Sequence, residues 1–292
     1  MTPITRLMQG AALAVLMAGA AAAQDFPERA VTLVIPFAAG GSTDVVGRIV
    51  AEKMSAQLGQ QVVVQNVGGA GGSLGAGQVA RAEPDGYTIL MGTVATHALN
   101  PLILTQKPYD PVADFAPVSL LVLVPNVLAV NPELGVDTVQ ELIDLAKSEP
   151  LAYASSGNGT PLHLSGELFK SMAGIDLTHI PYQGSGPALT DVLGNQVPII
   201  FDNLPSASSH IAAGSLKALG VTTTERAASF PDVPTIAETL PGYETYTWNA
   251  LFAPAGTPPE VVAALNEAAT AAMADPDVQA RMAEFSATIV AS

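Results

Sequence analysis

The chain has 292 residues, a length typical of two domains, and 49% of them are apolar, which excludes a disordered protein. Its formal net charge is −15, with 11 Lys and Arg against 26 Asp and Glu, and no two basic residues are adjacent. Because binding to a phosphate backbone requires clustered cations, this distribution excludes a nucleic-acid partner. The absence of Cys excludes disulfides, thiol catalysis, Cys-ligated metals and a bacterial lipid anchor.

The first 23 residues have the three-part layout of a secretory signal peptide. Arg6 is the one cation of residues 1–9, a small apolar run follows over residues 10–20, and residues 21–23 supply the small-x-small pattern of a cleavage site. The run is shorter than the roughly 20 residues that a membrane-spanning helix needs. We therefore expect cleavage before Gln24 and a soluble mature protein in the periplasm of a Gram-negative cell.

Short apolar strands then alternate with amphipathic helices. After the first strand, Val46, Val50 and Met54 recur at every fourth position, which is the spacing of a buried helix face, and Gly59 is placed to end that helix. This alternation predicts a mostly parallel α/β sheet. The first part of the chain is predicted to hold strands at 33–37, 62–64 and 87–91 and a helix from about residue 73.

The same unit restarts in the second part of the chain. Thr138 and Glu141 form a capping-box pattern, and Pro161 and Gly174 mark the start and end of another helix. The apolar stretch 118–130 is interrupted by Pro125, so it is interpreted as a buried pair of strands. The remaining predicted strands are 151–154, 177–181, 197–201, 216–221 and 246–252, followed by a long helix after Thr257 and a short one from Pro276.

Four loops between a strand and a helix are rich in small residues and contain no Lys or Arg. A helix N-terminus offers unpaired N–H groups and the positive end of the helix dipole, and such loops meet at the carboxyl ends of parallel strands. In any single loop the glycines could serve only to form a turn, but the same unit of strand, small-residue loop and helix recurs. We therefore expect an anion-binding cleft between two lobes. The loops are 39–44, 68–73, 155–160 and 183–186.

Ten segments carry a resemblance to one known family: Ile35–Asp44, Val64–Gly72, Pro84–Thr88, Thr96–Pro101, Tyr109–Val118, His163–Phe169, Pro181–Leu189, Phe201–Ser206, Asp232–Ile236 and Leu251–Pro258. Together they resemble the Bug family, the extracytoplasmic solute-binding proteins of tripartite tricarboxylate transporters. The resemblance covers nearly the whole mature chain in order.

The resemblance implies an α/β, two-lobed periplasmic binding protein of the Venus-flytrap type (type II-like), each lobe a mostly parallel sheet flanked by helices. Lobe 1 would comprise residues 24–121 and 247–292, lobe 2 would comprise residues 122–246, and two crossing strands would join them. It would capture a small mono-, di- or tricarboxylate and deliver it to membrane permease subunits. We expect a monomer without cofactor, metal or catalytic residues.

The resemblance also implies a set of ligand-binding residues drawn from loops of both lobes. Asp202 is the most informative of them, because an acid facing an anion is costly unless it meets a cationic group or a bridging water. One hypothesis is therefore a ligand with an amino or hydroxyl group beside its carboxylate. The set is Ala39, Gly40, Gly41, Thr43, Gly71, Ser73, Thr93, Thr96 and His97 from lobe 1, and Ser155, Asn158, Gly159, Ser185, Gly186 and Asp202 from lobe 2.

Alternatives remain open at this stage. Residues 71–75 fit the G-x-S-x-G expression of a serine hydrolase with Ser73 as nucleophile, although such a serine should directly follow a strand. Within the same fold, the protein could dock on a membrane sensor kinase instead of a permease. His163 lies in the first turn of a helix, where it is either structural or in contact with the cleft. Family members also continue through one more helix, whereas this sequence stops at Ser292, and the identity of the carboxylate stays open.

Overall fold

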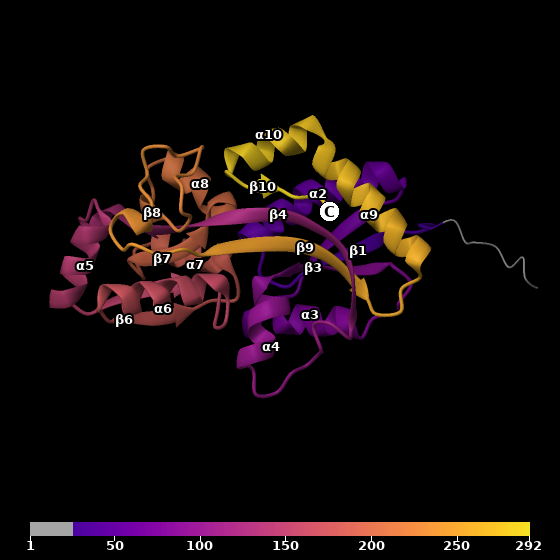
Figure 1. The fold of residues 1–292 in the computed structure, drawn as a ribbon, viewed down its shortest axis with the longest axis horizontal. Coiled ribbons are helices and arrows are strands. Elements are labelled where there is room, and N and C mark those ends of the chain that lie inside the picture. Colours follow the sequence, from indigo (N-terminus) through magenta and orange to yellow (C-terminus); the bar gives the residue numbers. More distant parts are fainter. Residues whose placement is uncertain (1–25) are drawn as a thin grey trace, which may run out of the picture.

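The computed structural model describes residues 26–292, so the predicted signal peptide and its cleavage site lie outside the described residues. Two α/β lobes lie side by side, and two long strands, β4 (Phe115–Val130) and β9 (Tyr246–Pro254), run from one lobe into the other (Figure 1). The C-terminal segment returns across lobe 1 and lies over β4 (Figure 1).

Lobe 1 is built from the N-terminal third of the chain and the C-terminal segment. Its remaining elements are β1 (Val31–Ile35), α2 (Ser42–Leu58), β2 (Val62–Asn66), η1 (Ala70–Gly72), α3 (Ser73–Ala80), β3 (Thr88–Thr93), η2 (Ala95–Leu99), α4 (Asn100–Ile103), α9 (Pro259–Ala274), α10 (Pro276–Glu284) and β10 (Thr288–Ile289).

Lobe 2 is one continuous stretch of chain between the crossing strands. Its elements are η3 (Pro132–Leu134), α5 (Val139–Ser148), β5 (Leu151–Ser155), α6 (Pro161–Ala173), β6 (Leu177–Pro181), α7 (Ser185–Leu193), β7 (Ile199–Asn203), α8 (Leu204–Ala212), β8 (Lys217–Val221) and η4 (Ile236–Glu238).

Each lobe has a parallel core that the crossing strands extend in the opposite direction. In lobe 1 the order is β2-β1-β3-β9-β4, with β1 parallel to β2 and β3, while β9 is antiparallel to β3 and β4. In lobe 2, β5 is parallel to β6 and β7, while β4 is antiparallel to β7 and β8. The parallel pairs are thus those whose strands are connected through helices, as expected, whereas every pair that includes β4 or β9 is antiparallel.

The stretch predicted as two strands interrupted by Pro125 is one strand, β4, so that prediction is wrong. The physical reason is the place of Pro125 in the pairing. β4 pairs with β9 up to Pro125 opposite Tyr246, and pairs with β7 from Asn126 opposite Asn203 onward. A proline lacks the N–H that a ladder requires, and here it falls where the strand exchanges one partner for another. The predicted lobe boundaries, after residues 121 and 246, fall inside β4 and at the first residue of β9 and stay predictions.

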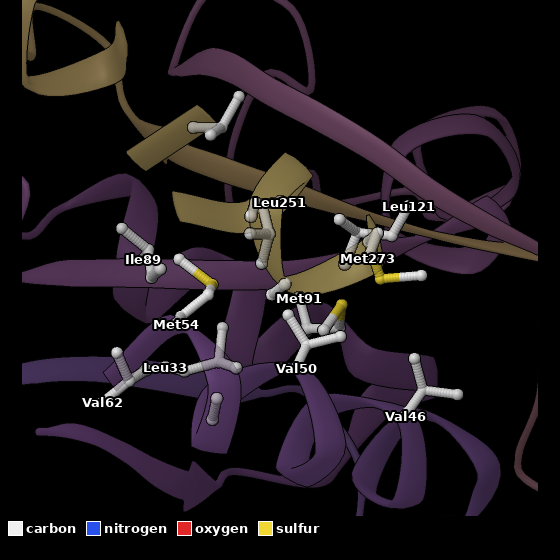
Figure 2. Close-up of a cluster of buried hydrophobic side chains, with 14 of the residues drawn as sticks. Leu33, Val46, Val50, Met54, Val62, Ile89, Met91, Leu121, Leu251 and Met273 are labelled. Carbon is white, nitrogen blue, oxygen red and sulfur yellow. The ribbon is translucent and has the colours of Figure 1, made fainter. Parts of the chain in front are cut away.

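The core of lobe 1 fills the space between its sheet and helices α2 and α9 (Figure 2). Val46, Val50 and Met54 of α2 are fully buried against Leu33 and Met91 of the sheet, which confirms the predicted helix face. Gly59 ends α2 in the left-handed conformation, also as predicted. A separate core in lobe 2 packs α5 and α6 against the other end of β4. Within residues 26–292, no helix has both the length and the apolar character needed to cross a membrane.

The junction of the two lobes is held by a buried amide at the point where β4 changes partner. The side-chain oxygen of Asn126 accepts hydrogen bonds from Asn203 of lobe 2 and from Thr247 of β9, the latter at 3.0 Å. Its side-chain nitrogen donates to Ser165 at 3.4 Å and Thr245 at 3.3 Å. Every hydrogen-bonding atom of this fully buried side chain therefore has a partner.

Replacing Asn126 should destabilise the protein strongly. In Asn126→Ala one N–H of the Asn203 amide and the O–H of Thr247 lose their acceptor while they stay buried, and only the hydrogen bond from Asn203 to Thr247 at 3.1 Å remains between them. A buried donor without an acceptor costs about 1–3 kcal/mol. We expect a loss of about 2–4 kcal/mol in the free energy of unfolding, measured by urea denaturation. Gln140→Ala on the exposed face of α5 is the control, with an expected change within about 0.5 kcal/mol. Equal stability of the two variants would contradict this role.

Candidate ligand-binding site

A small polar cavity of about 20 Å³ lies between the two lobes. This volume is about that needed to hold one water molecule, so the cavity in this form does not enclose a larger solute. Of the described residues that line the cavity, none has a charged side chain. The lining consists of Phe37, Gly41, Ser42, Thr43, Thr93 and Thr247 from lobe 1 and the crossing strand β9, and of Ser156, Thr160, Pro161, Leu162, Ser185 and Asn203 from lobe 2.

Four helices begin at this cavity. Ser42 opens α2, Pro161 opens α6, Ser185 opens α7, and Asn203 precedes α8. Only α6 has a side-chain cap, from Thr160 to the N–H of His163, whereas α2, α7 and α8 have none. The first N–H groups of a helix need partners from outside the helix. Their dipoles all place positive potential in the cavity, which therefore favours an anion without any cationic side chain.

Several buried polar atoms around the cavity have no hydrogen-bond partner. These include the hydroxyls of Ser42 and Thr93, both of which line it. Behind them, the amide of Asn249 donates to Thr43 at 3.5 Å and its oxygen is unpartnered. Because buried polar groups in folded proteins nearly always find a partner, this group of hydroxyls indicates a site for a polar solute.

The first loop of lobe 1 is positioned by a charged network behind the cavity. Asp44, 4% exposed, accepts hydrogen bonds from the N–H of Gly40 at 3.0 Å, from Arg48 at 3.1 Å and from Asn66 at 2.9 Å. Burial alone would raise the pKa of Asp44, but these hydrogen bonds outweigh it and the pKa lies below its usual value. Asn66 also donates to the carbonyl of Phe37 at 3.1 Å, so the network holds the loop from both ends.

Glycines allow the lobes to approach to backbone contact. The N–H of Ala38 donates to the carbonyl of Gln183 across the cleft at 2.9 Å. A methyl group added at Gly186 would lie 2.1 Å from the carbonyl oxygen of Ala39, and one added at Gly71 would lie 2.4 Å from that of Asn158. Only residues without a side chain fit at these two crossings, so the glycine-rich loops close the cleft as well as surround it.

Asp202 lies beside the cavity and is fully buried. Ser206 donates to its Oδ2 at 2.8 Å, while Oδ1 has no hydrogen-bond partner. Burial raises the pKa of Asp202 to about 6, although the neighbouring hydroxyls of Ser185 and Ser206 and the N–H of Asn203 favour the ionised form. Among residues 26–292, Asp202 forms no salt bridge.

Three of the four histidines, His97, His163 and His179, lie outside the cavity lining but next to its loops. The ring of His97 stacks on Phe252 at a centroid distance of 3.7 Å, and burial lowers its pKa to about 4. His163 accepts from the N–H of Gly159 at 3.2 Å and stacks on His179 at 4.1 Å. His179 lies 2.7 Å from the Ser155 hydroxyl, and its pKa is lowered to about 4 by burial and by His163. None of the three lines the cavity, and no group of three or more potential metal ligands occurs in the described part of the chain.

Ser73 lies on α3, where its hydroxyl accepts from the amide of Asn100 at 2.9 Å. It is 1% exposed, and no hydrogen bond joins it to a histidine in the described structure. Val64, on the preceding strand, is separated from Ser73 by the rest of β2 and a loop. The geometry that a nucleophile elbow requires is therefore not formed at this position.

The predicted ligand-binding residues fall into three groups. Gly41, Thr43, Thr93 and Ser185 line the cavity. Ala39, Gly40, Gly71, Asn158, Gly159 and Gly186 form the contacts between the lobes. Ser73, Thr96, Ser155 and Asp202 are buried behind these surfaces and His97 is partly buried there, and they hold the loops through hydrogen bonds or packing.

Eight lining residues were not in the predicted set. Ser42, Ser156 and Thr160 belong to loops that the sequence had marked, so the helix starts themselves carried a signal for them. Asn203 directly follows the predicted Asp202. Thr247 lies on a crossing strand and only the tertiary structure brings it to the cavity. The other three are Phe37, Pro161 and Leu162.

Two α/β lobes that meet over a polar cavity and are joined by crossing strands define a two-lobed solute-binding protein. Residues 46–292 match the profile of the family described as "Tripartite tricarboxylate transporter family receptor". The chain belongs to this family, and the resemblance to Bug proteins is thereby confirmed. A curated relative, BugT of Bordetella pertussis, is 39% identical over 270 residues, which are 90% of this chain and 83% of the relative.

Solved structures of similar proteins confirm the two-lobed periplasmic binding protein fold. The periplasmic binding protein BugD has a TM-score of 0.89 and 39% identity, covering 91% of this chain and 90% of BugD. R. palustris Rpa4515 with adipate has a TM-score of 0.87 and 41% identity, covering 90% of this chain and 89% of that one. MatC from Rhodopseudomonas palustris with bound malate has a TM-score of 0.86 and 37% identity, covering 90% and 91%.

Gly186→Ala should hold the lobes apart. The added methyl group would collide with the Ala39 carbonyl oxygen, whereas alanine favours the α7 helix itself, so ligand-free stability should change by less than about 1 kcal/mol. We expect a larger radius of gyration by small-angle X-ray scattering than for the unmodified protein. Gly194→Ala at the other end of α7 is the matched control, because its methyl group meets only α7 itself. A Gly186→Ala protein as compact as this control would contradict the closure role.

The raised pKa of Asp202 predicts a pH-dependent contribution to stability. The folded protein binds this proton more tightly than the unfolded chain does, so the contribution is complete below about pH 4 and is lost as pH rises through about 6. From pH 4 to 7 the ligand-free protein should lose about 2 kcal/mol relative to Asp202→Asn. Urea denaturation of both proteins across this range measures the difference. A constant difference would show that the Asp202 carboxyl group is ionised at the same pH in the folded and unfolded states.

Proposed function

We propose that this protein captures a small organic carboxylate between its lobes and delivers it to the membrane permease of a tripartite tricarboxylate-type transporter. The observation that carries the proposal is the convergence of four helix N-termini, three of them without a side-chain cap, on a cavity lined by hydroxyls. This arrangement supplies donors and positive potential to an anion of small size.

A carboxylate suits this site, because the described lining offers hydroxyl and backbone N–H donors and no charged side chain. Its two oxygens are acceptors only, and the unpartnered hydroxyls of Ser42 and Thr93 can both donate to them. The similar proteins with adipate and malate support the same ligand class. The ligand-binding set predicted from the sequence, together with Ser42, Ser156, Thr160, Asn203 and Thr247, is our candidate set of residues that hold or enclose it.

Binding would proceed by closure of the lobes. The cavity is too small for a dicarboxylate to enter while the Ala38–Gln183 hydrogen bond is formed, so an open form must admit the ligand. The bound carboxylate then shifts the population toward the closed form, which presents one joined surface of both lobes to the permease. The proposal also includes location in the periplasm after removal of residues 1–23 and a monomeric, non-catalytic protein. The periplasmic solute-binding relatives support the location and the binding role.

Thermal unfolding in the presence of mono-, di- and tricarboxylates tests the ligand class. A ligand that binds only the folded state and is present at 100 times its Kd adds about 2.7 kcal/mol to the free energy of unfolding. We expect at least one carboxylate, with adipate and malate in the panel, to raise the Tm by several degrees. The carboxylate should be recovered chemically unchanged. No shift with any member would contradict the proposed function.

Thr93→Val separates binding from folding. The variant removes an unpartnered buried hydroxyl and keeps the side-chain shape, so ligand-free stability should be equal or higher. The lost hydrogen bond to a carboxylate should weaken binding by roughly 10- to 100-fold. Ser119→Ala is the matched control, because the Ser119 hydroxyl on β4 is also buried and unpartnered but lies outside the cavity lining. Unchanged affinity in Thr93→Val would place the carboxylate elsewhere.

A further inference from the structure

Asp202 is a buried acid that lies next to the cavity, where its charge would interact with that of a bound anion. It is the residue before Asn203, which lines the cavity, and it faces the hydroxyl of Ser185, which lines the cavity from α7. Its exposed surface is zero, and Oδ1 has no hydrogen-bond partner. A carboxylate bound in the cavity and the Asp202 carboxyl group would therefore share the same helix N-termini.

The groups that face Asp202 do not include a cation in salt-bridge contact. From α7 and α8 it meets the hydroxyls of Ser185 and Ser206, and on β4 the residue opposite is Val127. The charged and titratable residues that line an outer groove together with Ser206 are His210 of α8 and Arg281 and Glu284 of α10. Helix α2, which packs on α8, carries Asp44, and Asp44 is paired with Arg48 at 2.9 Å. Arg281 is paired with Glu284 at 2.7 Å, so its charge is already compensated.

Two negative charges next to one another in a buried site repel strongly, because little water is present to screen them. A cation, which could relieve this repulsion, is not in contact with Asp202 in the described structure. A proton can relieve it, because the carboxyl group then becomes neutral and can donate through the oxygen that has no partner. Protonation of Asp202 also removes the cost of burying its charge.

We propose that binding of a carboxylate in the cavity is coupled to the uptake of one proton by the carboxyl group of Asp202. The protein then captures the ligand anion and a proton together, and it releases both when the lobes open. This inference rests on the proposed function, since it requires a carboxylate at this site.

The pKa of Asp202 in the ligand-free protein makes the coupling effective near neutral pH. In the ligand-free protein burial raises the pKa of Asp202 to about 6, so the group is mostly ionised at about pH 7. A bound anion raises this pKa further. Between the free and bound pKa values the affinity falls by up to tenfold for each pH unit, and below about pH 6 it becomes nearly independent of pH.

Calorimetric titration with adipate and with malate in two buffers of different ionisation enthalpy, both at about pH 7, counts the protons exchanged on binding. We expect an uptake approaching one proton per ligand bound. Binding without net proton uptake would overturn the inference and leave the proposed function intact. No binding of either ligand or of any other member of the carboxylate panel would instead contradict the proposed function itself.

Asp202→Asn identifies the group that takes up the proton. The asparagine has the shape of the neutral carboxyl group, so we expect the variant to bind without proton uptake, with an affinity independent of pH and higher than that of the unmodified protein at about pH 8. Asp191→Asn, on the same helix as Ser185 but hydrogen-bonded to Tyr182, should retain the uptake. Uptake that persists in Asp202→Asn would assign the proton to another group and overturn the inference. The proton count of the unmodified protein decides the coupling even if the variant fails to fold.

Discussion

The structure depends on oriented backbone dipoles at the ends of helices α2, α6, α7 and α8, which meet between the lobes. Fixed dipoles can stabilise a small anion without adding formal charge, and they need no reorganisation when it arrives. The strongly acidic composition of the chain is therefore compatible with an anionic ligand. The polar residues that line the cavity are mostly hydroxyls, with one amide. These groups can donate hydrogen bonds to the lone pairs of the proposed carboxylate.

This mode of binding imposes demands on the rest of the fold. Helix ends from different lobes must come within a few ångströms of each other, which requires backbone contact at Gly186 and Gly71. The loops must also keep their shape while the lobes move. Asp44 with Arg48 and Asn66 does this in lobe 1, and the hydrogen bond between Ser155 and His179 does it in lobe 2. Much of what surrounds the cavity thus serves to position donors and does not itself contact the cavity.

The sequence predicted the elements well wherever local chemistry determines them. The buried face of α2, the end of α2 at Gly59 and the bounds of α6 follow from spacing, capping and proline placement, and all three are found in the structure. The prediction failed at Pro125, because a proline normally interrupts a strand and only the exchange of partners from β9 to β7 makes it acceptable.

For the candidate site, the loops could be predicted but not the direction of each side chain. Ser42 and Thr160 lie in marked loops, yet the sequence does not show which hydroxyl of a helix start points into the cavity. Thr247 could not be predicted, because it lies within a strand and nothing in the local sequence indicates that this strand passes the cavity. The resemblance placed His97 in the ligand-binding set, and the structure shows that its ring stacks on Phe252, a contact that the sequence does not indicate. Long-range packing determines the direction of these side chains, and residue spacing along the chain does not reveal it.

The continuity of β4 and β9 has a consequence for how the lobes move. Neither strand contains a loop between the lobes, so the opening that we propose would bend two continuous strands. The four helix ends would return to one another as these strands bend back on closing.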